Sequence, residues 1–305
     1  MSAQNCTATT KLNTGATIPQ LGFGTWRSTE EDGYNAVLAA LKDGYRHIDS
    51  AAVYGNEAAV GRAIRDSKVP REELFVTTKL WNTQHREPAK ALDQSLARLG
   101  LDYVDLYLIH WPLPLKTERI KDDNLFSIPT KDDGKPDVDS EWDYIKTWHL
   151  MQELPASGKT KAVGVSNCSV AQLQSLINHK DNKIVPACNQ VEVHPLLPQN
   201  EMYDFCKENN IVMEAYSPLG SQGSPVADEP AIKEIAKKYN VDAAQVLISW
   251  GVERGYVILP KSVTPSRIKS NFQTVKLSAD DVAAINKIHK EKGETRINDP
   301  EWFQF

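Results

Sequence analysis

The sequence has 305 residues, of which 41% are hydrophobic and 25% are charged, so it has enough apolar mass for a sizeable core. Its formal net charge is −5 and the two signs are interspersed, which argues against the broad basic face that a nucleic acid or an anionic membrane would require. No apolar run is long enough to span a bilayer, and we expect no signal peptide at the N-terminus.

The chain begins with a predicted hairpin over residues 9–22, around Asn13-Thr14-Gly15. After the hairpin, short apolar strands alternate with segments in which apolar residues recur at helical spacing. The predicted strands cover residues 21–26, 45–51, 74–80, 103–112, 161–167, 187–195, 211–220 and 256–262. The predicted helices cover residues 29–43, 57–66, 86–100, 141–158, 169–180, 200–210, 229–240, 242–255, 265–273 and 278–293.

Two segments interrupt this alternation. Residues 112–140 are polar, contain prolines and have no clear period, so they predict a long loop after the fourth strand of the series. Residues 294–305 form a tail after the last helix.

Eight strand-then-helix units imply parallel strands with right-handed crossovers. They fit a closed (β/α)8 TIM barrel, and we expect residues 1–305 to form a single domain. The structural rival is an open doubly wound sheet, which would need a G-x-G-x-x-G loop after its first strand. Here Gly22 and Gly24 are followed by Arg27 where the third glycine should stand.

The four cysteines are scattered, and no pair has the spacing of a zinc site. They are Cys6, Cys168, Cys188 and Cys206. A chain of this length does not need disulfides for stability, so we expect reduced thiols in a cytoplasmic protein.

The polar residues at the strand ends are the candidates for function, because barrel active sites lie at the carboxyl ends of the strands. In chain order they are Asp49, Tyr54, Lys79, His110, Ser166, Asn167, Gln190, Tyr216, Ser217, Lys261 and Ser262. A lysine and a histidine inside apolar strands are costly unless they are paired.

Four of these residues suit one reaction. A tyrosine is a weak acid with a pKa near ~10, and a neighbouring lysine ammonium lowers that pKa. Asp49 would keep Lys79 charged, and His110 would orient a carbonyl oxygen while Tyr54 protonates it. No side chain can supply a hydride, so the reduction would need a nicotinamide.

Each of the four also has a purely structural interpretation. Asp49 and Lys79 could be only a buried ion pair, His110 a satisfied core histidine, and Tyr54 an aromatic at the rim. Their occurrence together at strand ends favours a site. His47 and His194 are interpreted as structural.

Three stretches resemble the signatures of the aldo-keto reductases: "GYRHIDSAAVYGNEAAVG" at 44–61, "KAVGVSN" at 161–167 and "LPKSVTPSRIKSN" at 259–271. The resemblance covers the whole chain in the same order. It implies a (β/α)8 barrel with an N-terminal hairpin, a long loop after strand 4 and a C-terminal loop over the site. The pattern is most similar to the yeast NADP-dependent branch of glycerol dehydrogenases and α-keto ester or carbonyl reductases.

The resemblance implies reduction of aldehydes and ketones with NADPH, and oxidation of alcohols in reverse, without a metal. Tyr54 would be the acid, Lys79 and Asp49 would tune it, and His110 would orient the substrate. Steroid double-bond reductases of the family carry glutamate at the position of His110, so carbonyl reduction is favoured.

The resemblance also implies the cofactor contacts. Ser166, Asn167 and Gln190 would bind the carboxamide, Tyr216 would stack on the nicotinamide, and Asn271 would contact the adenine. The implied cofactor set is Thr25, Ser166, Asn167, Gln190, Tyr216, Ser217, Leu219, Lys261, Ser262, Thr264, Arg267 and Asn271. Relatives often carry glutamate where this chain has Ser270, and an aromatic residue where it has Cys168.

The segment with Lys261, Ser262 and Arg267 also favours a phosphate from its residues alone. Two cations and a hydroxyl surround a predicted helix start, and Arg267 suits the 2′-phosphate of NADP. The purely structural alternative is a solvent-exposed helix start with Thr264 as its N-cap and Pro265 at its first position.

Trp26, Trp81 and Trp111 lie at strand ends and predict an apolar substrate pocket, with Asn298 and Trp302 of the tail implied by the resemblance. We expect a small carbonyl substrate and a monomer, with a homodimer as the alternative. Two other functions remain possible. One is an NADPH-binding regulatory subunit with little turnover, and the other is a metal- or phosphate-dependent barrel lyase or isomerase.

Overall fold

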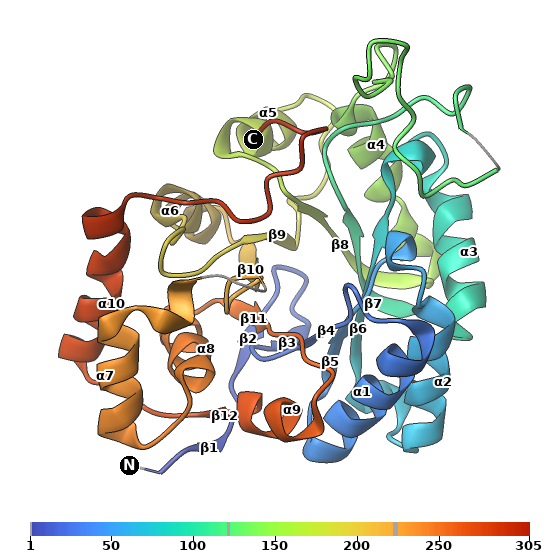
Figure 1. Cartoon of the computed structure of the whole chain (residues 1–305). Helices are drawn as coiled ribbons and strands as arrows, with labels where there is room; N and C mark the ends of the chain where they lie inside the picture. The colour runs from blue at the N-terminus through green and yellow to red at the C-terminus, as the bar shows by residue number, and fades with distance from the viewer. Residues whose placement is uncertain (1, 121–122, 222–224) are drawn as a thin grey trace.

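The computed structural model describes residues 2–120, 123–221 and 225–305. Its centre is an eight-stranded parallel sheet in the order β11-β10-β9-β8-β7-β6-β5-β4 (Figure 1). The strands are β4 (Phe23–Gly24), β5 (His47–Asp49), β6 (Phe75–Leu80), β7 (Val104–Ile109), β8 (Thr160–Ser166), β9 (Cys188–Glu192), β10 (Val212–Tyr216) and β11 (Val257–Leu259).

The two ends of this sheet meet and close a barrel. Leu21, just before β4, bridges Ile258 of β11 in parallel. The N–H of Gly22 donates to the carbonyl of Ile258 at 2.9 Å, and the N–H of Gly24 donates to the carbonyl of Pro260 at 3.0 Å. The predicted (β/α)8 TIM barrel is therefore confirmed, and the open doubly wound sheet is excluded.

Helices cover the outside of the barrel. They are α1 (Glu30–Asp43), α2 (Glu57–Ser67), α3 (Pro88–Leu99), α4 (Tyr144–Met151), α5 (Val170–Ile177), α6 (Asn200–Glu208), α7 (Pro230–Tyr239), α8 (Ala243–Glu253), α9 (Pro265–Asn271) and α10 (Ala279–Lys292). Their ends follow local chemistry: the Thr29 hydroxyl accepts from the N–H of Asp32, and Ser169 forms a capping box with Gln172.

Two small antiparallel sheets lie beside the barrel. The predicted hairpin is confirmed as β2 (Thr9–Lys11) paired with β3 (Thr17–Pro19), and β1 (Gln4–Asn5) pairs with β12 (Gln273–Thr274). Leu12 and Ile18 of the hairpin pack with Phe75, Ala187 and Val257, which stand at or just before the starts of strands. The hairpin therefore closes the amino end of the barrel, and the carboxyl end remains for a site.

The predicted helix over 141–158 is shorter in the structure. α4 ends at Met151, and a 3-10 helix, η4 (Leu154–Ser157), follows it. Pro155 is the physical reason, because it has no N–H to donate to the carbonyl of Met151, four residues earlier, and its ring clashes with that carbonyl in an α-helix.

The described part of the long loop contains no helix or strand and is closed by isolated bridges between Leu115 and Val138 and between Thr130 and Pro136. Residues 121 and 122 of the predicted 112–140 loop lie outside the described residues. The tail over 294–305 runs from α10 past α6 towards α5, as the red trace in Figure 1 shows. Within the described ranges, no helix is both long and apolar enough to cross a membrane.

Candidate active site at the carboxyl end of the barrel

A tight turn after β5 positions Tyr54. The strand ends at Asp49, and the 3-10 helix η1 (Ala52–Tyr54) follows at once. Gly55 ends η1 with a φ of +69°, a conformation that glycine adopts without strain. This turn brings the hydroxyl of Tyr54 close to the end of β6.

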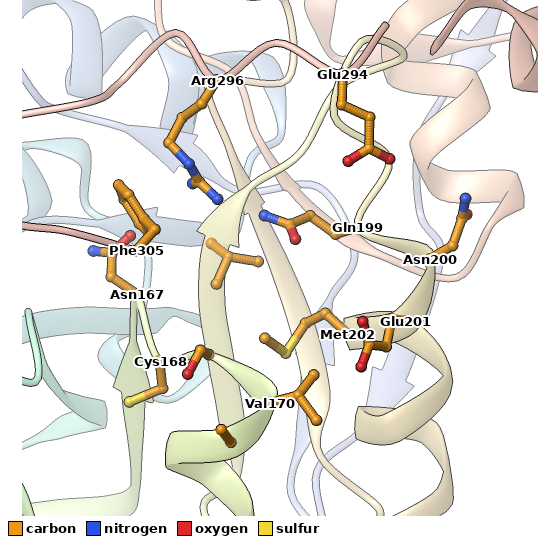
Figure 2. A pocket seen from close by; sticks show the side chains of 13 residues that line it. Asn167, Cys168, Val170, Gln199, Asn200, Glu201, Met202, Glu294, Arg296 and Phe305 are labelled. Atoms are coloured by element: carbon orange, nitrogen blue, oxygen red, sulfur yellow. The ribbon is translucent and has the colours of Figure 1, made fainter. Parts of the chain in front are cut away.

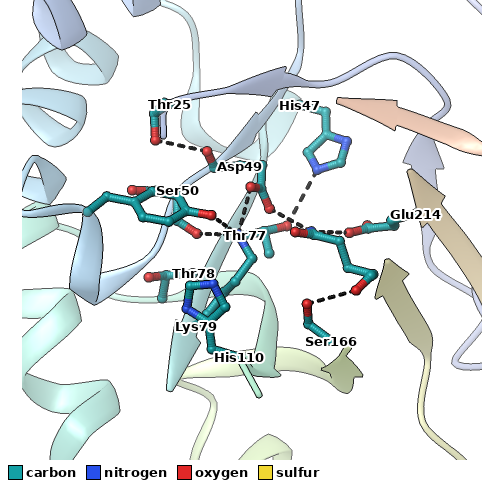
Figure 3. A network of polar contacts seen from close by, with 12 residues as sticks. Thr25, His47, Asp49, Ser50, Thr77, Thr78, Lys79, His110, Ser166 and Glu214 are labelled. Atoms are coloured by element: carbon teal, nitrogen blue, oxygen red, sulfur yellow. Dashed lines mark hydrogen bonds and ion pairs between the residues drawn. The ribbon is translucent and has the colours of Figure 1, made fainter. Parts of the chain in front are cut away.

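Lys79 on β6 is the centre of the polar cluster, and its side chain is fully buried. Its Nζ donates to Asp49 Oδ1 at 2.7 Å, to the Ser50 carbonyl at 2.8 Å and to the Tyr54 hydroxyl at 3.3 Å. An ammonium has three N–H donors, and all three have partners here (Figure 3). The His110 ring meets the Tyr54 ring edge-on, with 5.7 Å between centroids. The structure therefore brings together all four residues of the predicted tetrad.

Burial and charge act in opposite directions on this cluster. Burial acts to lower the pKa of Lys79, but Asp49 and Tyr54 outweigh it and raise that pKa, so the ammonium stays charged. Burial raises the pKa of Tyr54, and the opposing effect of Lys79 is smaller. Lys79 lowers the pKa of Tyr54, as the sequence predicted, but burial outweighs it, so the net pKa is above its ordinary value.

His110 is neutral in this environment. Burial first, and the charge of Lys79 second, hold the pKa of its imidazole well below the usual range. Its Nδ1 is buried without a hydrogen-bond partner. A neutral imidazole carries one N–H, so His110 can donate a hydrogen bond to a substrate oxygen.

Behind the tetrad lies Glu214 on β10, a residue that the sequence analysis missed. The Nε2 of Gln190 donates to Asp49 Oδ2 at 2.9 Å and to Glu214 Oε2 at 2.7 Å. Glu214 is fully buried. A glutamate inside the apolar strand "VMEAY" is the same signal that singled out Lys79, so the sequence did contain a clue.

The residues implied for the carboxamide form a connected network. Ser166 Oγ donates to the Gln190 carbonyl at 2.7 Å, and Asn167 Nδ2 donates to the His110 carbonyl at 3.0 Å. The Tyr216 hydroxyl donates to Asn167 Oδ1 at 2.8 Å. Asn167 has a φ of +60°, which asparagine tolerates better than most residues. Thr25 lies beside this network, and its hydroxyl donates to the Asp49 carbonyl at 3.0 Å.

The segment after β11 holds the residues implied for the cofactor phosphate. Pro265 occupies the first position of α9, but Thr264 at the N-cap makes no side-chain capping bond. The Ser262 hydroxyl instead accepts from the N–H of Thr264 at 3.1 Å. Arg267 is exposed and makes no ion pair with any described residue. Its guanidinium is therefore free to pair with an anion.

The other residues implied for the cofactor lie around the same rim. Ser217 and Leu219 follow β10, and Lys261 follows β11, all partly buried. Lys261 Nζ donates to the Arg27 carbonyl at 3.4 Å, and burial lowers the pKa of Lys261. Asn271 is buried at the end of α9.

An aromatic cluster forms one wall of the barrel mouth. Trp111 lies 4.9 Å from Trp302 and 4.9 Å from Phe303 between ring centroids, and Trp81 lies 6.0 Å from Trp302. The long loop contributes too, since Trp81 Nε1 donates to the Ser127 carbonyl at 3.3 Å. Phe303 is a member that the sequence analysis missed.

Trp26 stands apart from this cluster. It is 38% exposed, and Arg27 lies over its ring at 4.3 Å. Among the described residues it makes no ring contact with Trp81, Trp111 or Trp302. The structure therefore brings three of the four predicted tryptophans together.

A third missed residue, Glu192 at the end of β9, anchors the tail. Its carboxylate accepts from the N–H groups of Ile297 and Asn298, both at 2.7 Å, and from His194 Nε2 at 2.7 Å. The predicted Asn298 donates in turn to Ser217 Oγ at 2.9 Å. His194 therefore has the structural role that was expected, and it helps to fix the tail over the barrel.

His47 is also structural. It is fully buried, and its ring nitrogens lie 3.3 Å from the Pro19 carbonyl and 3.4 Å from Thr77 Oγ1. The four cysteines are all free and buried, as the expected reduced thiols require.

A hollow of about 420 Å³ adjoins the site but does not contain the tetrad. Figure 2 shows it between the loop at Asn167 and Cys168, the start of α6 and the tail. Arg296 and Phe305 come from the tail, and the Arg296 guanidinium lies 3.5 Å from the centroid of the Phe305 ring. Cys168 also lines this hollow.

Comparisons with known proteins agree with this geometry. The model of the Aldo/keto reductase family matches residues 20–290. The aldehyde reductase YPR1 of Saccharomyces cerevisiae is 59% identical over 303 residues, covering 99% of this chain and 97% of that protein. The glycerol 2-dehydrogenase (NADP(+)) of the same yeast is 63% identical over 295 residues, covering 96% of this chain and 95% of that protein.

A comparison with solved structures also supports the barrel fold. The crystal structure of an aldo/keto reductase from Brucella melitensis matches with a TM-score of 0.79 and 40% sequence identity. The match covers 94% of this chain and 100% of that one.

Proposed function

The chain belongs to the aldo/keto reductase family, and from that premise we propose that it reduces aldehydes and ketones with NADPH and oxidises alcohols with NADP⁺ in reverse. It is an oxidoreductase that uses NADP(H), as its yeast relatives indicate. The observation that carries the chemistry is the hydrogen bond of 3.3 Å from Lys79 Nζ to the Tyr54 hydroxyl, beside a neutral His110.

The residues at the barrel mouth fit a nicotinamide cofactor. Gln190 uses both N–H hydrogens on carboxylates, and its amide oxygen accepts no hydrogen bond within the described ranges. That oxygen is suited to the N–H₂ of a carboxamide, and Asn167 Oδ1 keeps a second lone pair. The exposed Arg267 and the nearby Lys261 suit the 2′-phosphate of NADP(H).

Proton transfer is the task of Tyr54. When bound, NADPH supplies a hydride to the carbonyl carbon. Tyr54 gives its phenolic proton to the carbonyl oxygen, and Lys79 stabilises the phenolate that remains. Asp49 keeps Lys79 charged and in place at 2.7 Å. His110 donates its N–H to the same oxygen and so orients the substrate.

The substrate pocket suits a small carbonyl compound with an apolar part. Trp81, Trp111, Trp302 and Phe303 offer an apolar wall beside His110, whose ring lies 5.4 Å from that of Trp81. The names of the two yeast relatives suggest aldehydes and glycerol-like alcohols as first candidates. We also propose that the enzyme works as a monomer in the cytoplasm, and the four free, buried cysteines support a reducing compartment.

The test is loss of reduced-nicotinamide absorbance with purified protein. NADPH and NADH are compared with aromatic aldehydes, α-keto esters, glyceraldehyde and xylose, with and without a chelator. We expect turnover with NADPH that the chelator does not affect. Tight NADPH binding without turnover of any carbonyl would favour a regulatory subunit instead, and loss of activity to the chelator would favour a metal-dependent reaction.

A further inference from the structure

Glu214 belongs to no step of the proposed mechanism, although it lies within two hydrogen bonds of Asp49. It stands in the middle of β10, in register with Gln190 of β9. Figure 3 shows the side chain of Glu214 within the polar network, and its Oε2 accepts from Gln190 Nε2 at 2.7 Å. Gln190 Nε2 bridges it to Asp49, and Asp49 bonds Lys79. A continuous chain of hydrogen bonds therefore joins Glu214 to the acid Tyr54.

The two carboxyl groups that Gln190 bridges, those of Asp49 and Glu214, differ in how their negative charge is balanced. Asp49 has the ammonium of Lys79 at 2.7 Å. Among the described residues, Glu214 has a single neutral donor, the amide of Gln190, and its other oxygen, Oε1, is buried without a hydrogen-bond partner. Burying a charge with a single neutral partner is costly, and protonation removes that charge.

The titratable groups that interact with Glu214, from β9 beside it and from β5 and β6 across the barrel, also favour its protonated form. They are Asp49 on β5, Lys79 on β6 and Cys188 on β9. β11, on the other side of β10, contributes only apolar residues. Burial of Cys188 raises its pKa well above the usual range, so its thiol stays neutral. Burial, and then repulsion from Asp49, raise the pKa of Glu214 to about 7, although Gln190 and Lys79 oppose them.

We propose that Glu214 is a positioning residue whose proton controls the catalytic cluster. When Glu214 is protonated, Lys79 interacts with one negative charge, that of Asp49. The amide of Gln190 then stays fixed for the cofactor. When ionised, Glu214 adds a second negative charge behind Lys79, and that charge holds Tyr54 in its phenol form. This inference rests on the proposed function. Its consequence is that alcohol oxidation, which needs the phenolate as base, is restrained as Glu214 loses its proton.

Glu214→Gln is the decisive variant, because it removes the charge but keeps an oxygen that accepts from Gln190. We expect the rise of kcat for alcohol oxidation with pH to move to lower pH by roughly 0.6 to 1.2 units, the effect of one charge taken at ~10 Å with an effective dielectric constant of about 20 to 40. NADP⁺ affinity should stay unchanged. A profile that superimposes on that of the wild type would overturn the proposal.

A matched control is Glu57→Gln. Glu57 is also a buried glutamate, but it bonds Arg98 at 2.6 Å and Thr78 at 2.6 Å rather than the tetrad. Its replacement should lower the Tm and leave the pH profile of oxidation in place. A shift in this control equal to that of Glu214→Gln would mean that loss of any buried charge moves the profile, and would overturn the specific role.

A measurement on the cofactor-free protein does not depend on activity. Infrared difference spectra between about pH 5.5 and about pH 8.5 should contain the carbonyl stretch of a protonated buried carboxyl, lost in Glu214→Gln. Absence of a band assignable to Glu214 in the wild type would overturn the proposal even if the variant failed to fold. If the wild type turned over no substrate, the proposed function would fail, while this spectrum would still report whether Glu214 titrates.

Discussion

Tyr54 is the residue on which the chemistry depends, and its surroundings act on its pKa in opposite directions. Burial raises the pKa of the phenol, and Lys79 offsets only part of that effect. A phenol that keeps its proton at neutral pH is suited to act as an acid in reduction. The role of Lys79 is then to stabilise the phenolate once the proton has left, rather than to create it beforehand.

Tyr54→Phe should lower kcat for carbonyl reduction by about 10²-fold or more, because the phenol is the acid that reaches the substrate oxygen in the proposed mechanism. Affinity for NADPH should change little, since the proposed cofactor contacts lie on other residues. Steady-state turnover and fluorescence titration with NADPH check the two parts. Near-normal turnover by the variant would show that another group supplies the proton.

Arg267→Ala should weaken NADPH binding far more than NADH binding. Only NADPH carries the 2′-phosphate, and Arg267 is exposed with no described ion pair to hold it elsewhere. We expect a loss of roughly 10-fold or more in NADPH affinity, the range of a charge-assisted contact. The comparison is made by titrating both cofactors. Equal losses for NADPH and NADH would refute Arg267 as the residue that discriminates between them.

At the scale of elements, the buried acid Glu192 is one of the anchors that hold the tail on the barrel. Burial acts to raise the pKa of Glu192, but hydrogen bonds from His194, Ile297 and Asn298 outweigh it and lower that pKa. A lowered pKa means that this attachment is fully present above the ordinary glutamate pKa of ~4.3 and is lost as the pH falls below it. The tail holds Trp302 and Phe303 against Trp111.

Glu192→Ala should therefore free the tail and open the aromatic wall of the pocket. We expect KM for carbonyl substrates to rise by about 10-fold while NADPH affinity is largely kept, because Glu192 is not among the implied cofactor contacts. Limited proteolysis within residues 294–305 should also become faster.

Glu253→Gln is the control for this experiment, since Glu253 pairs with Lys276 at 2.6 Å and has no contact with the tail. It should leave both KM and the proteolysis rate unchanged. An unchanged KM in Glu192→Ala, with the tail still protected, would show that the remaining contacts of the tail, the aromatic cluster and the Asn298–Ser217 hydrogen bond among them, are enough to hold it.

At the scale of the whole molecule, barrel closure joins the two halves of the chain. Leu21 meets Ile258, and the β1–β12 sheet ties residues 4–5 to residues 273–274. Because elements far apart in sequence depend on each other in this way, we propose that residues 1–305 are one domain.

We expect one cooperative transition in scanning calorimetry, moved to higher temperature by saturating NADP⁺. Analytical ultracentrifugation of the same sample should give the mass of one chain, 34.1 kDa. Two resolved transitions would contradict the single domain, and twice that mass would favour the homodimer.

Local sequence patterns determined much of this protein. Alternating apolar periods predicted the eight strand-then-helix units, and a closed parallel barrel follows from their number and order. The residues at the strand ends predicted the tetrad, because polar groups inside apolar strands stand out. The short η4 and the early end of α4 were missed, although Pro155 gave a signal.

Only the tertiary structure decided which side chains meet and how their charges balance. It separated Trp26 from the other tryptophans, joined Glu192 to the tail and put Glu214 behind Asp49. It also decided the direction of the Tyr54 pKa shift. The physical reason is that periodicity is a local property of the chain, whereas burial and electrostatic interaction depend on contacts between strands that lie far apart in sequence.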